Sequence, residues 1–323
     1  MNLLITGGLG YIGSHLCVEL LKSKAKIFVL DNLSNSSLKR KKNIEKISKK
    51  NINLIKNDLN NYNKISKILI NNKIDTVFHL AGLKSVKESF LKSYEYYLNN
   101  SFATMQLLKA MKESKVNKII FSSSATVYGV KNKNPIKEIG NLDTINPYGT
   151  SKLISEKLII DQAKLDKNFK YIILRYFNPI GYHQSGLLSD DISEDNLVPN
   201  LIKKLKSKKP FLIYGNNYRT KDKTAIRDYI HIYDLISAHI LSLKKFTKNK
   251  NEIFNVGTGK GYTVLDIIKS FQKILNKKID IMYTNRRKGD PEAIYCSAAK
   301  IIKKLKWKPK YSVLDMCKYS IRN

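Results

Sequence analysis

Short apolar runs alternate with longer amphipathic stretches through the first half of this chain of 323 residues. Short apolar runs bounded by turn residues are typical of buried strands, whereas apolar positions three and four residues apart are typical of helices. The expected strands span residues 3–5, 26–31, 53–58, 74–81, 118–122 and 171–175, with long helices over about 94–115 and 148–164. Because strands that alternate with helices form parallel sheets with helices on both faces, the sequence predicts an α/β, doubly wound parallel sheet.

The alternation breaks after Asn178, where loops, shorter elements and an acidic stretch at residues 190–195 follow. Two later segments, Arg227–Asp234 and Glu252–Gly257, are predicted to return to the main sheet. We therefore expect two discontinuous domains. Residues 1–177 and about 227–258 form the sheet domain, and about 178–226 and 259–323 form a smaller α/β substrate-binding domain.

Four glycines follow the first strand directly, and a helical pattern begins at Tyr11. The glycines are Gly7, Gly8, Gly10 and Gly13. Glycine permits a tight turn and a close approach of the backbone to a pyrophosphate, which the partial positive charge of a helix N-terminus attracts. This arrangement predicts a Rossmann-type dinucleotide-binding domain.

Asp31 ends the second predicted strand, where a carboxylate accepts hydrogen bonds from the adenosine ribose and repels a 2′-phosphate. The basic run at residues 39–42 comes too late to change this preference, so NAD is predicted rather than NADP. Asp58 follows the third strand and either accepts a hydrogen bond from the adenine or caps the next helix. Ala81, Gly82 and Lys84 follow the fourth strand at the ligand-binding edge of the sheet.

A serine-rich strand end precedes a tyrosine and a lysine four residues apart, Tyr148 and Lys152. On a helix that begins near Pro147, this spacing places both side chains on one face. An ammonium and a positively charged nicotinamide favour a nearby phenolate, which can then act as a base near neutrality. Ser124 is placed to hydrogen-bond the reacting hydroxyl. These three residues are predicted to be catalytic.

Five separated segments resemble those of the UDP-glucose 4-epimerases, which are extended short-chain dehydrogenases/reductases. The segments are Thr6–His15, Phe121–Gly129, Pro147–Lys152, Arg175–Pro179 and Arg227–His231. The resemblance spans nearly the whole chain, from Asn2 to about Pro309. It implies that Tyr148 removes the proton of the sugar 4-hydroxyl while NAD⁺ takes the C4 hydride. The 4-keto sugar then turns over, and NADH returns the hydride to its opposite face.

The resemblance also implies which residues hold the two ligands. The NAD set is Gly7, Gly10, Tyr11, Ile12, Gly13, Asp31, Asn32, Asn35, Asp58, Leu59, Ala81, Gly82, Lys84, Asn99, Ser122, Tyr148, Lys152 and Phe177. The UDP-sugar set is Lys84, Ser124, Tyr148, Asn178, Asn196, Leu197, Tyr214, Arg227, Arg287, Asp290 and Ile294, and Tyr176 also lines the site. Arg227 and Arg287 would bind phosphate and Asp290 ribose.

Ile294 stands where some bacterial members carry a tyrosine that narrows the sugar pocket. The smaller side chain predicts additional activity on UDP-GlcNAc and UDP-GalNAc. A nucleotide-sugar 4,6-dehydratase is the nearest competing enzyme class, but Ala125 and Thr126 stand where such enzymes carry an Asp–Glu pair. A net oxidoreductase would need an exchangeable cofactor. A non-catalytic dinucleotide sensor would typically lack the tyrosine or the lysine, and both are present here.

The formal net charge of +33 raises the question of nucleic acid. The lysines are spread over the whole chain and no nucleic-acid-binding motif accompanies them, so we expect only weak, salt-sensitive binding. The three cysteines are scattered, and no histidine has metal-ligand spacing, so no metal is expected. No apolar run reaches membrane-spanning length and no basic-then-apolar leader opens the chain. These features predict a cytoplasmic protein, and the resemblance implies a homodimer.

Overall fold

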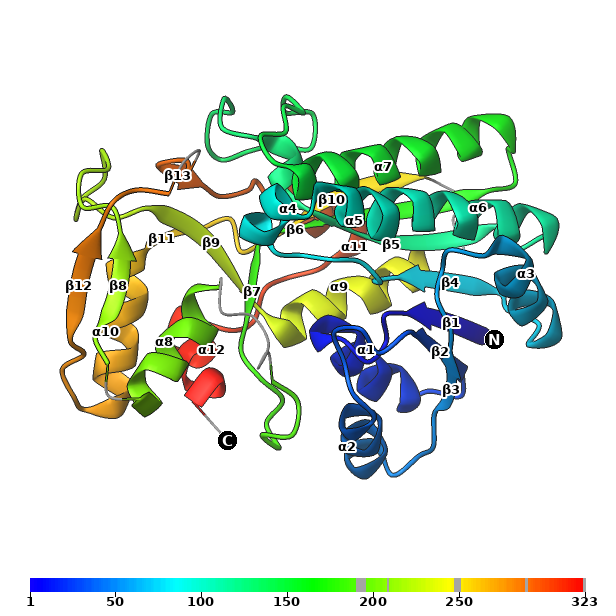
Figure 1. Cartoon of the computed structure of the whole chain (residues 1–323), viewed down its shortest axis with the longest axis horizontal. Coiled ribbons are helices and arrows are strands. Elements are labelled where there is room, and N and C mark those ends of the chain that lie inside the picture. The colour runs from blue at the N-terminus through cyan, green and yellow to red at the C-terminus, as the bar shows by residue number, and fades with distance from the viewer. Residues whose placement is uncertain (190–195, 208, 247–250, 288–289, 322–323) are drawn as a thin grey trace.

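The computed structural model describes residues 1–189, 196–207, 209–246, 251–287 and 290–321. Its largest sheet has seven strands, all parallel, in the order β10-β6-β5-β4-β1-β2-β3 (Figure 1). They are β1 (Asn2–Thr6), β2 (Lys26–Asp31), β3 (Asn53–Lys56), β4 (Thr76–His79), β5 (Lys118–Ser124), β6 (Lys170–Tyr176) and β10 (Glu252–Val256). The predicted doubly wound parallel sheet is confirmed. The acidic stretch at 190–195 lies outside the described residues.

Both faces of this sheet are buried, which explains why its strands read as continuous apolar runs. Along β1, Leu3 and Ile5 belong to one core and Leu4 to the other. The first core packs under α1 (Tyr11–Leu21), α2 (Leu38–Ser48), α9 (Ile232–Lys245) and α11 (Ala299–Leu305). The second packs under α3 (Tyr62–Asn71), α6 (Ala103–Glu113) and α7 (Pro147–Leu165). In Figure 1, α6 and α7 lie above the sheet and α3 lies at its right end.

The strand order reverses between β1 and β4, the position at which doubly wound sheets bind ligands. The loops after these strands approach so closely that only a glycine fits between them. Gly7 has a φ of +67°, and a Cβ there would lie 2.7 Å from the backbone nitrogen of Ala81. The glycine run therefore borders the ligand-binding edge of the sheet, as predicted.

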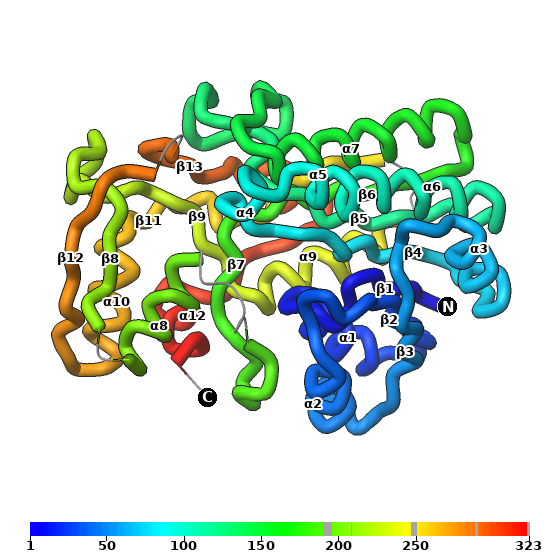
Figure 2. The backbone as a smooth tube through the Cα atoms, viewed as in Figure 1, coloured from blue at the N-terminus to red at the C-terminus, as the bar shows by residue number. Residues whose placement is uncertain are grey.

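The helical stretch predicted at 94–115 is not a regular α-helix. It consists of α5 (Ser93–Tyr96), a π-helical segment (Tyr97–Phe102) and α6, which follow one another in the tube of Figure 2, and α4 (Val86–Leu91) precedes them. π-Helical turns are rare and frequently occur at functional sites. This one carries Asn99 and Asn100, which lie beside the loop that follows β4.

A second lobe, at the left of Figure 1, has its own core and two small sheets. Its strands are β7 (Asn178–Ile180), β8 (Phe211–Tyr214), β9 (Ile226–His231), β11 (Gly261–Thr263), β12 (Ile281–Thr284) and β13 (Ala293–Ile294). Its helices are α8 (Leu197–Ser207), α10 (Val264–Leu275) and α12 (Val313–Ile321).

The prediction that Arg227–Asp234 and Glu252–Gly257 both return to the main sheet is correct for the second segment and wrong for the first. β10 pairs with β6 in that sheet, but β9 pairs with β7, β11 and β13 in the second lobe. The apolar pattern of β9 showed a buried strand but carried no information about its partners. α9, which follows β9 directly, does pack against α1 of the main domain.

A cluster of aromatic and histidine side chains joins the two lobes. His231, at the end of β9, stacks on Tyr311 with ring centroids 4.0 Å apart. His15 of α1 contacts Tyr233 of α9 edge-on, and the Tyr11 hydroxyl donates to the Gly181 carbonyl at 2.5 Å. These contacts tie the start of α1 to the beginning of the second lobe.

The three cysteines, Cys17, Cys296 and Cys317, are all buried and unpaired by disulfides. Within the described part of the chain, no helix combines the length and apolar character needed to cross a bilayer.

Candidate active site

A cavity of about 120 Å³ opens at the carboxyl edge of the main sheet, around the reversal of strand order. Ten residues of the predicted NAD set line it: Gly7, Gly10, Asp31, Asn32, Asn35, Asp58, Leu59, Ala81, Gly82 and Asn99. These residues come from five separate stretches of the chain. The loops after β1, β2, β3 and β4 and the π-helical segment therefore converge on one place.

The glycine turn leads into a helix start suited to an anion. Gly10 is the N-cap of α1, without a side-chain capping bond, and no acidic residue stands in the first turn, where Tyr11 and Ile12 lie. A Cβ on Gly13 would lie 2.3 Å from the Gly7 carbonyl oxygen, so this position too requires glycine. A dinucleotide pyrophosphate fits such a helix N-terminus, since it faces both N–H groups and the helix dipole.

Asp31 lines the cavity and also orders the loops around it. Its carboxylate accepts hydrogen bonds from the backbone of Leu9 at 2.9 Å and of Leu33 at 3.0 Å. The hydroxyl of Ser36 donates to it at 2.8 Å. The residue predicted to bind ribose therefore also holds the glycine turn in place.

Asp58 does not cap the following helix, so the capping interpretation is wrong. The N-cap of α3 is Asn61, whose side chain accepts from the backbone of Lys64. The Asp58 carboxylate instead accepts from the Asn32 amide at 2.8 Å and from the backbone of Asn60 at 2.9 Å. Its position in the cavity wall leaves the adenine-binding interpretation as the prediction that stands.

The end of β5 meets the start of α7 at the next position along the same edge. Asn146 caps α7 by accepting from the backbone of Gly149 at 2.8 Å, and Pro147 occupies the first turn. Tyr148 is hydrogen-bonded to Ser124, and the Lys152 ammonium donates to the Ser122 carbonyl at 2.9 Å. The three residues predicted to be catalytic thus lie together on one helix face and one strand end.

Burial sets the electrostatics of this group. It raises the pKa of the Tyr148 phenol, an effect that the hydrogen bond from Ser124 opposes. Burial also lowers the pKa of Lys152 to about 8. Because burial outweighs the Ser124 hydrogen bond, lowering the phenol pKa below its usual value requires nearby cations, namely the Lys152 ammonium and the positive ring of a bound cofactor.

His79 lies behind this group at the end of β4 and is fully buried. It bonds to Thr6 through Nδ1 at 2.8 Å and to Thr104 through Nε2 at 2.9 Å. Burial, assisted by the charge of Lys152, lowers its pKa to about 3, so the ring is neutral. His79 thus connects β1, β4 and α6.

The loop after β4 is fastened by Asn100, a residue that the sequence interpretation missed. Its side-chain oxygen accepts from the backbone of Leu83 at 2.8 Å, and its amide donates to Ser151 at 2.8 Å. A Cβ on Gly82 would lie 2.7 Å from that same oxygen. The sequence signal that could have pointed to Asn100 was the pair Asn99 and Asn100 within an otherwise helical stretch. Lys84, in this loop, lies over the Tyr11 ring.

Apart from Lys84, Ser124 and Tyr148, the predicted UDP-sugar residues lie in the second lobe. Arg227, on β9, forms an ion pair with Asp290. The Arg287 guanidinium stacks over the Tyr214 ring, 4.2 Å from its centroid. Ile294, on β13, pairs in register with Arg227. A cation pair, a carboxylate and a flat ring are the groups that a nucleoside diphosphate requires.

Four predicted residues lie elsewhere in this region. Phe177 is buried after β6, and the Asn178 amide donates to the Asp228 carbonyl at 2.8 Å, which ties β7 to β9. Asn196 is exposed just before α8, and Leu197 is the first residue of that helix.

Tyr218 is a second residue that the sequence interpretation missed. Its side chain is buried, its hydroxyl donates to Asp290 at 3.0 Å, and the Arg286 guanidinium stacks on its ring at 3.9 Å. Tyr218 and Arg227 thus hold the two oxygens of one carboxylate. Only the tertiary structure brings the 215–225 loop beside Asp290, so no local motif marked this tyrosine.

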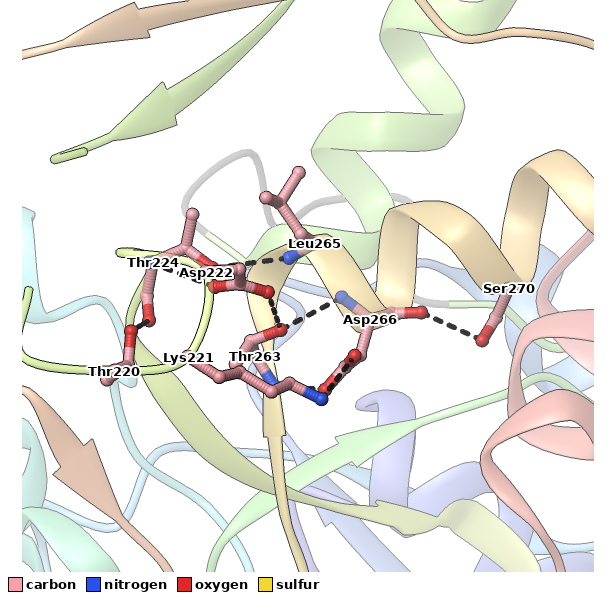
Figure 3. A network of polar contacts seen from close by, with 8 residues as sticks. All are labelled: Thr220, Lys221, Asp222, Thr224, Thr263, Leu265, Asp266 and Ser270. Carbon is pink, nitrogen blue, oxygen red and sulfur yellow. Dashed lines mark hydrogen bonds and ion pairs between the residues drawn. The ribbon is translucent and has the colours of Figure 1, made fainter.

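The loop that carries Tyr218 is anchored to the start of α10 (Figure 3). Asp222 accepts from the Thr263 hydroxyl at 2.5 Å, and Thr263 forms a capping box with Asp266. Lys221 pairs with Asp266 at 2.8 Å. These bonds hold the loop next to Asp290, the carboxylate predicted to bind the nucleoside.

No cluster of three or more histidine, cysteine, aspartate or glutamate side chains with metal-binding geometry occurs among the residues that the structure describes.

Comparison with known proteins agrees with this geometry. The family model described as GDP-mannose 4,6 dehydratase matches residues 4–319. A UDP-glucose 4-epimerase of Bacillus subtilis is 41% identical, covering 100% of this chain and 96% of its own. The structure of UDP-glucose 4-epimerase from Bifidobacterium longum in complex with NAD+ and UDP is 40% identical, with a TM-score of 0.95 over 100% of this chain and 97% of that one.

A third similar structure is the UDP-Glc/GlcNAc 4-epimerase of Campylobacter jejuni, 34% identical, with a TM-score of 0.87 over 99% of this chain and 98% of that one. Identity of this extent over whole chains shows a shared family. The chain belongs to the UDP-glucose 4-epimerase family of extended short-chain dehydrogenases/reductases.

Proposed function

We propose that this protein is an NAD-dependent UDP-glucose 4-epimerase, which interconverts UDP-glucose and UDP-galactose. The observation that carries the proposal is the hydrogen-bonded Ser124–Tyr148 pair beside Lys152. It stands at the same sheet edge as the nucleotide cavity. Relatives with this name at about 41% identity over whole chains support it.

The residues around the cavity fit NAD. Gly7, Gly10 and the N-terminus of α1 would hold the pyrophosphate, Asp31 the adenosine ribose and Asp58 the adenine. Lys152 and the loop after β4 would hold the nicotinamide half. When bound, the dinucleotide supplies the two-electron oxidant for the sugar C4 and then the reductant.

The chain's own groups then move one proton. The Tyr148 oxygen accepts the proton of the sugar 4-hydroxyl as a general base, and Ser124 hydrogen-bonds that hydroxyl and positions it. The Lys152 ammonium stabilises the phenolate electrostatically. In the return step the Tyr148 phenol gives the proton back to the 4-oxygen. Protons and electrons balance within one site, so no exchange of cofactor is required.

The second lobe would grip the nucleotide and leave the sugar loosely held. We propose that Arg227 and Arg287 bind the diphosphate and that Asp290 binds the ribose. Asn178, Asn196 and Leu197 would contact the diphosphate or sugar. Because β9 belongs to the second lobe and α11 packs against β10 and α9, we propose that residues 178–231 and 257–298, together with α12, bind the UDP-sugar. In this division α9, β10 and α11 belong to the NAD domain.

A dehydratase is disfavoured, although the matching family model bears that name. Elimination of water needs an acid and a base beside the sugar. Here the Ala125 side chain has no polar atom, and the Thr126 hydroxyl donates to Ser124 at 3.0 Å. Neither position supplies a carboxylate.

We also propose a cytoplasmic homodimer that accepts N-acetylated sugars. Ile294 is smaller than tyrosine and neighbours Arg227, where room for an N-acetyl group would be needed.

The dimer proposal rests on apolar side chains that are exposed on α4, α5 and the π-helical segment, with Leu91 81% and Tyr94 87% exposed. An open hollow of about 620 Å³, lined by Tyr94, Leu98 and Phe102 and by Ile154 of α7, suits a four-helix contact with a second copy.

The test is to incubate the purified protein with UDP-galactose, without added NAD, and to measure UDP-glucose. Tyr148→Phe should lower kcat by about 10²–10⁴-fold, the usual contribution of a general base. Tyr171→Phe, at the opposite end of the strands, is the matched control and should retain activity. Absence of conversion by the unaltered protein, or release of NADH during turnover, would contradict the proposal.

A further inference from the structure

A buried ion pair lies directly beneath the residues proposed for proton transfer. The side chains of Glu156 on α7 and Arg175 on β6 are 1% and 2% exposed. Arg175 donates from Nε to Oε1 at 3.0 Å and from Nη2 to Oε2 at 2.7 Å, the bidentate geometry of an ionised pair. Apolar residues of similar volume often stabilise a core equally well, because removing two charges from water is costly. The location of this pair therefore requires an explanation beyond packing.

Glu156 lies on the catalytic face of α7. Tyr148, Lys152 and Glu156 are successively four residues apart, which stacks their side chains along one face of the helix. Each contacts one of three consecutive serines of β5: Tyr148 contacts the Ser124 hydroxyl, Lys152 the Ser122 carbonyl, and Glu156 the Ser123 hydroxyl, which donates to it at 2.5 Å. The helix and the strand end are therefore held in one register by three adjacent contacts.

Arg175 connects the Glu156–Ser123 contact to the rest of the sheet. It is the in-register partner of Ser123 on the neighbouring strand. Its Nη1 donates to the Tyr128 hydroxyl at 2.9 Å and to the Glu138 carbonyl at 3.0 Å. The Tyr128 hydroxyl in turn donates to Asn255 of β10 at 2.6 Å. Glu156 is thus clamped from β5, β6 and β10.

The same carboxylate acts on Lys152 electrostatically. Lys152 interacts electrostatically with Glu156 on its own helix and with His79 of β4, and Tyr148 precedes it by one turn of α7. On β6, Arg175 pairs with Glu156, and the Tyr176 hydroxyl bonds to the hydroxyl of Ser122, the residue whose carbonyl accepts from Lys152. Burial lowers the pKa of Lys152 to about 8, and the charge of Glu156 raises it against that effect.

We propose that Glu156, clamped by Arg175 and Ser123, is a positioning residue of the active site. Its carboxylate sets the register of α7 on β5 and supplies the counter-charge that stabilises the Lys152 ammonium. Its link to catalysis rests on the proposed function, whereas its effect on Lys152 does not.

The titration of Lys152 tests the electrostatic role directly. In holoenzyme carrying ¹³C-labelled lysine, the Lys152 signal is the one missing from a Lys152→Met variant. Glu156→Gln leaves Arg175 as an unopposed cation, so the Lys152 midpoint should fall by about one pH unit. In Glu156→Gln with Arg175→Met both charges are gone, and the midpoint should lie between those of the single variant and the unaltered protein. Asp161→Asn removes an exposed carboxylate from the same helix and should shift nothing.

The pH at which kcat changes on the alkaline side of its profile should shift in the same order. The shift should be largest in Glu156→Gln, smaller in the double variant and absent in Asp161→Asn. If Glu156→Gln does not fold, the double variant carries the test, since a neutral pair of similar volume is often tolerated. An unchanged Lys152 midpoint in whichever of the two folds would overturn the inference. Equal loss of activity at every pH, with the midpoint unmoved, would assign Glu156 a purely structural role and overturn it as well. An inactive unaltered protein would contradict the proposed function while the titration still decides this inference.

Discussion

At the scale of single residues, the same chemical group takes different roles according to its neighbours. Asp31 and Asp58 both follow parallel strands and line one cavity. Asp31 accepts three hydrogen bonds from the loops around it, whereas Asp58 accepts one from Asn32 across the cavity wall and one from its own turn. Asn61 takes the capping role that Asp58 was also predicted to fill. Residue type and spacing therefore indicate a place in the fold, and hydrogen-bond partners decide the role.

At the same scale, we propose that Ile294 determines the size of the sugar that is accepted. Ile294→Tyr should lower turnover of UDP-GlcNAc by about tenfold or more relative to UDP-galactose, because a larger side chain fills the space an N-acetyl group requires. Steady-state rates with both substrates measure the ratio. Ile294→Val is the matched control and should keep both activities. Failure of the unaltered protein to turn over UDP-GlcNAc where UDP-galactose reacts would refute this role.

At the scale of elements, α7 carries two of the three residues proposed to be catalytic. It is capped by Asn146, starts with Pro147 and presents Tyr148, Lys152 and Glu156 to the end of β5. The neighbouring helical stretch departs from the expected regular helix at its π-helical turn, which carries Asn99 into the cavity wall. Helical periodicity predicted that both stretches are helical. The pattern of apolar positions does not reveal the extra residue that a π-helical turn contains.

The exposed apolar face of these helices leads to the prediction of a dimer. Glutamate substitution of Tyr94 and Leu98 together should convert the dimer to a monomer, with association weakened about tenfold or more, because charges would be buried at the contact. Sedimentation velocity measures the state. Ile139→Glu, at an apolar position that is 91% exposed on the 130–145 loop, is the control and should stay dimeric. An unaltered protein that sediments as a monomer would rule the dimer out.

At the scale of the whole molecule, two lobes are joined by buried neutral histidines. Burial lowers the pKa of His15, His79 and His231 to about 3 and that of His239 to about 4. His15 and His231 lie in the aromatic cluster between the lobes, and His79 and His239 lie behind the active site. The histidines that lacked metal-ligand spacing in the sequence thus serve packing and hydrogen bonding.

Stability should therefore fall on the acid side. Each lowered pKa means that the unfolded chain binds a proton below about pH 6.5 and the folded chain does not. Stability is complete above that pH and is lost as the pH falls toward 3–4, with about 2 kcal/mol per buried histidine lost at pH 5. Urea unfolding at pH 7.5 and at pH 5 measures the difference. Equal unfolding free energies at the two pH values would contradict the assignment of neutral buried rings.

The sequence alone determined the fold class, and it predicted the nucleotide-binding edge and the three residues proposed to be catalytic, because each rests on local signals. Glycine spacing, apolar strand runs and the four-residue spacing of Tyr148 and Lys152 are properties of short segments. The tertiary structure decided which strands and side chains contact one another. It placed β9 in the second lobe, brought Tyr218 to Asp290, and set Glu156 against Arg175, which are 19 residues apart in the chain. Such contacts depend on which segments pack together, and no local pattern encodes that choice.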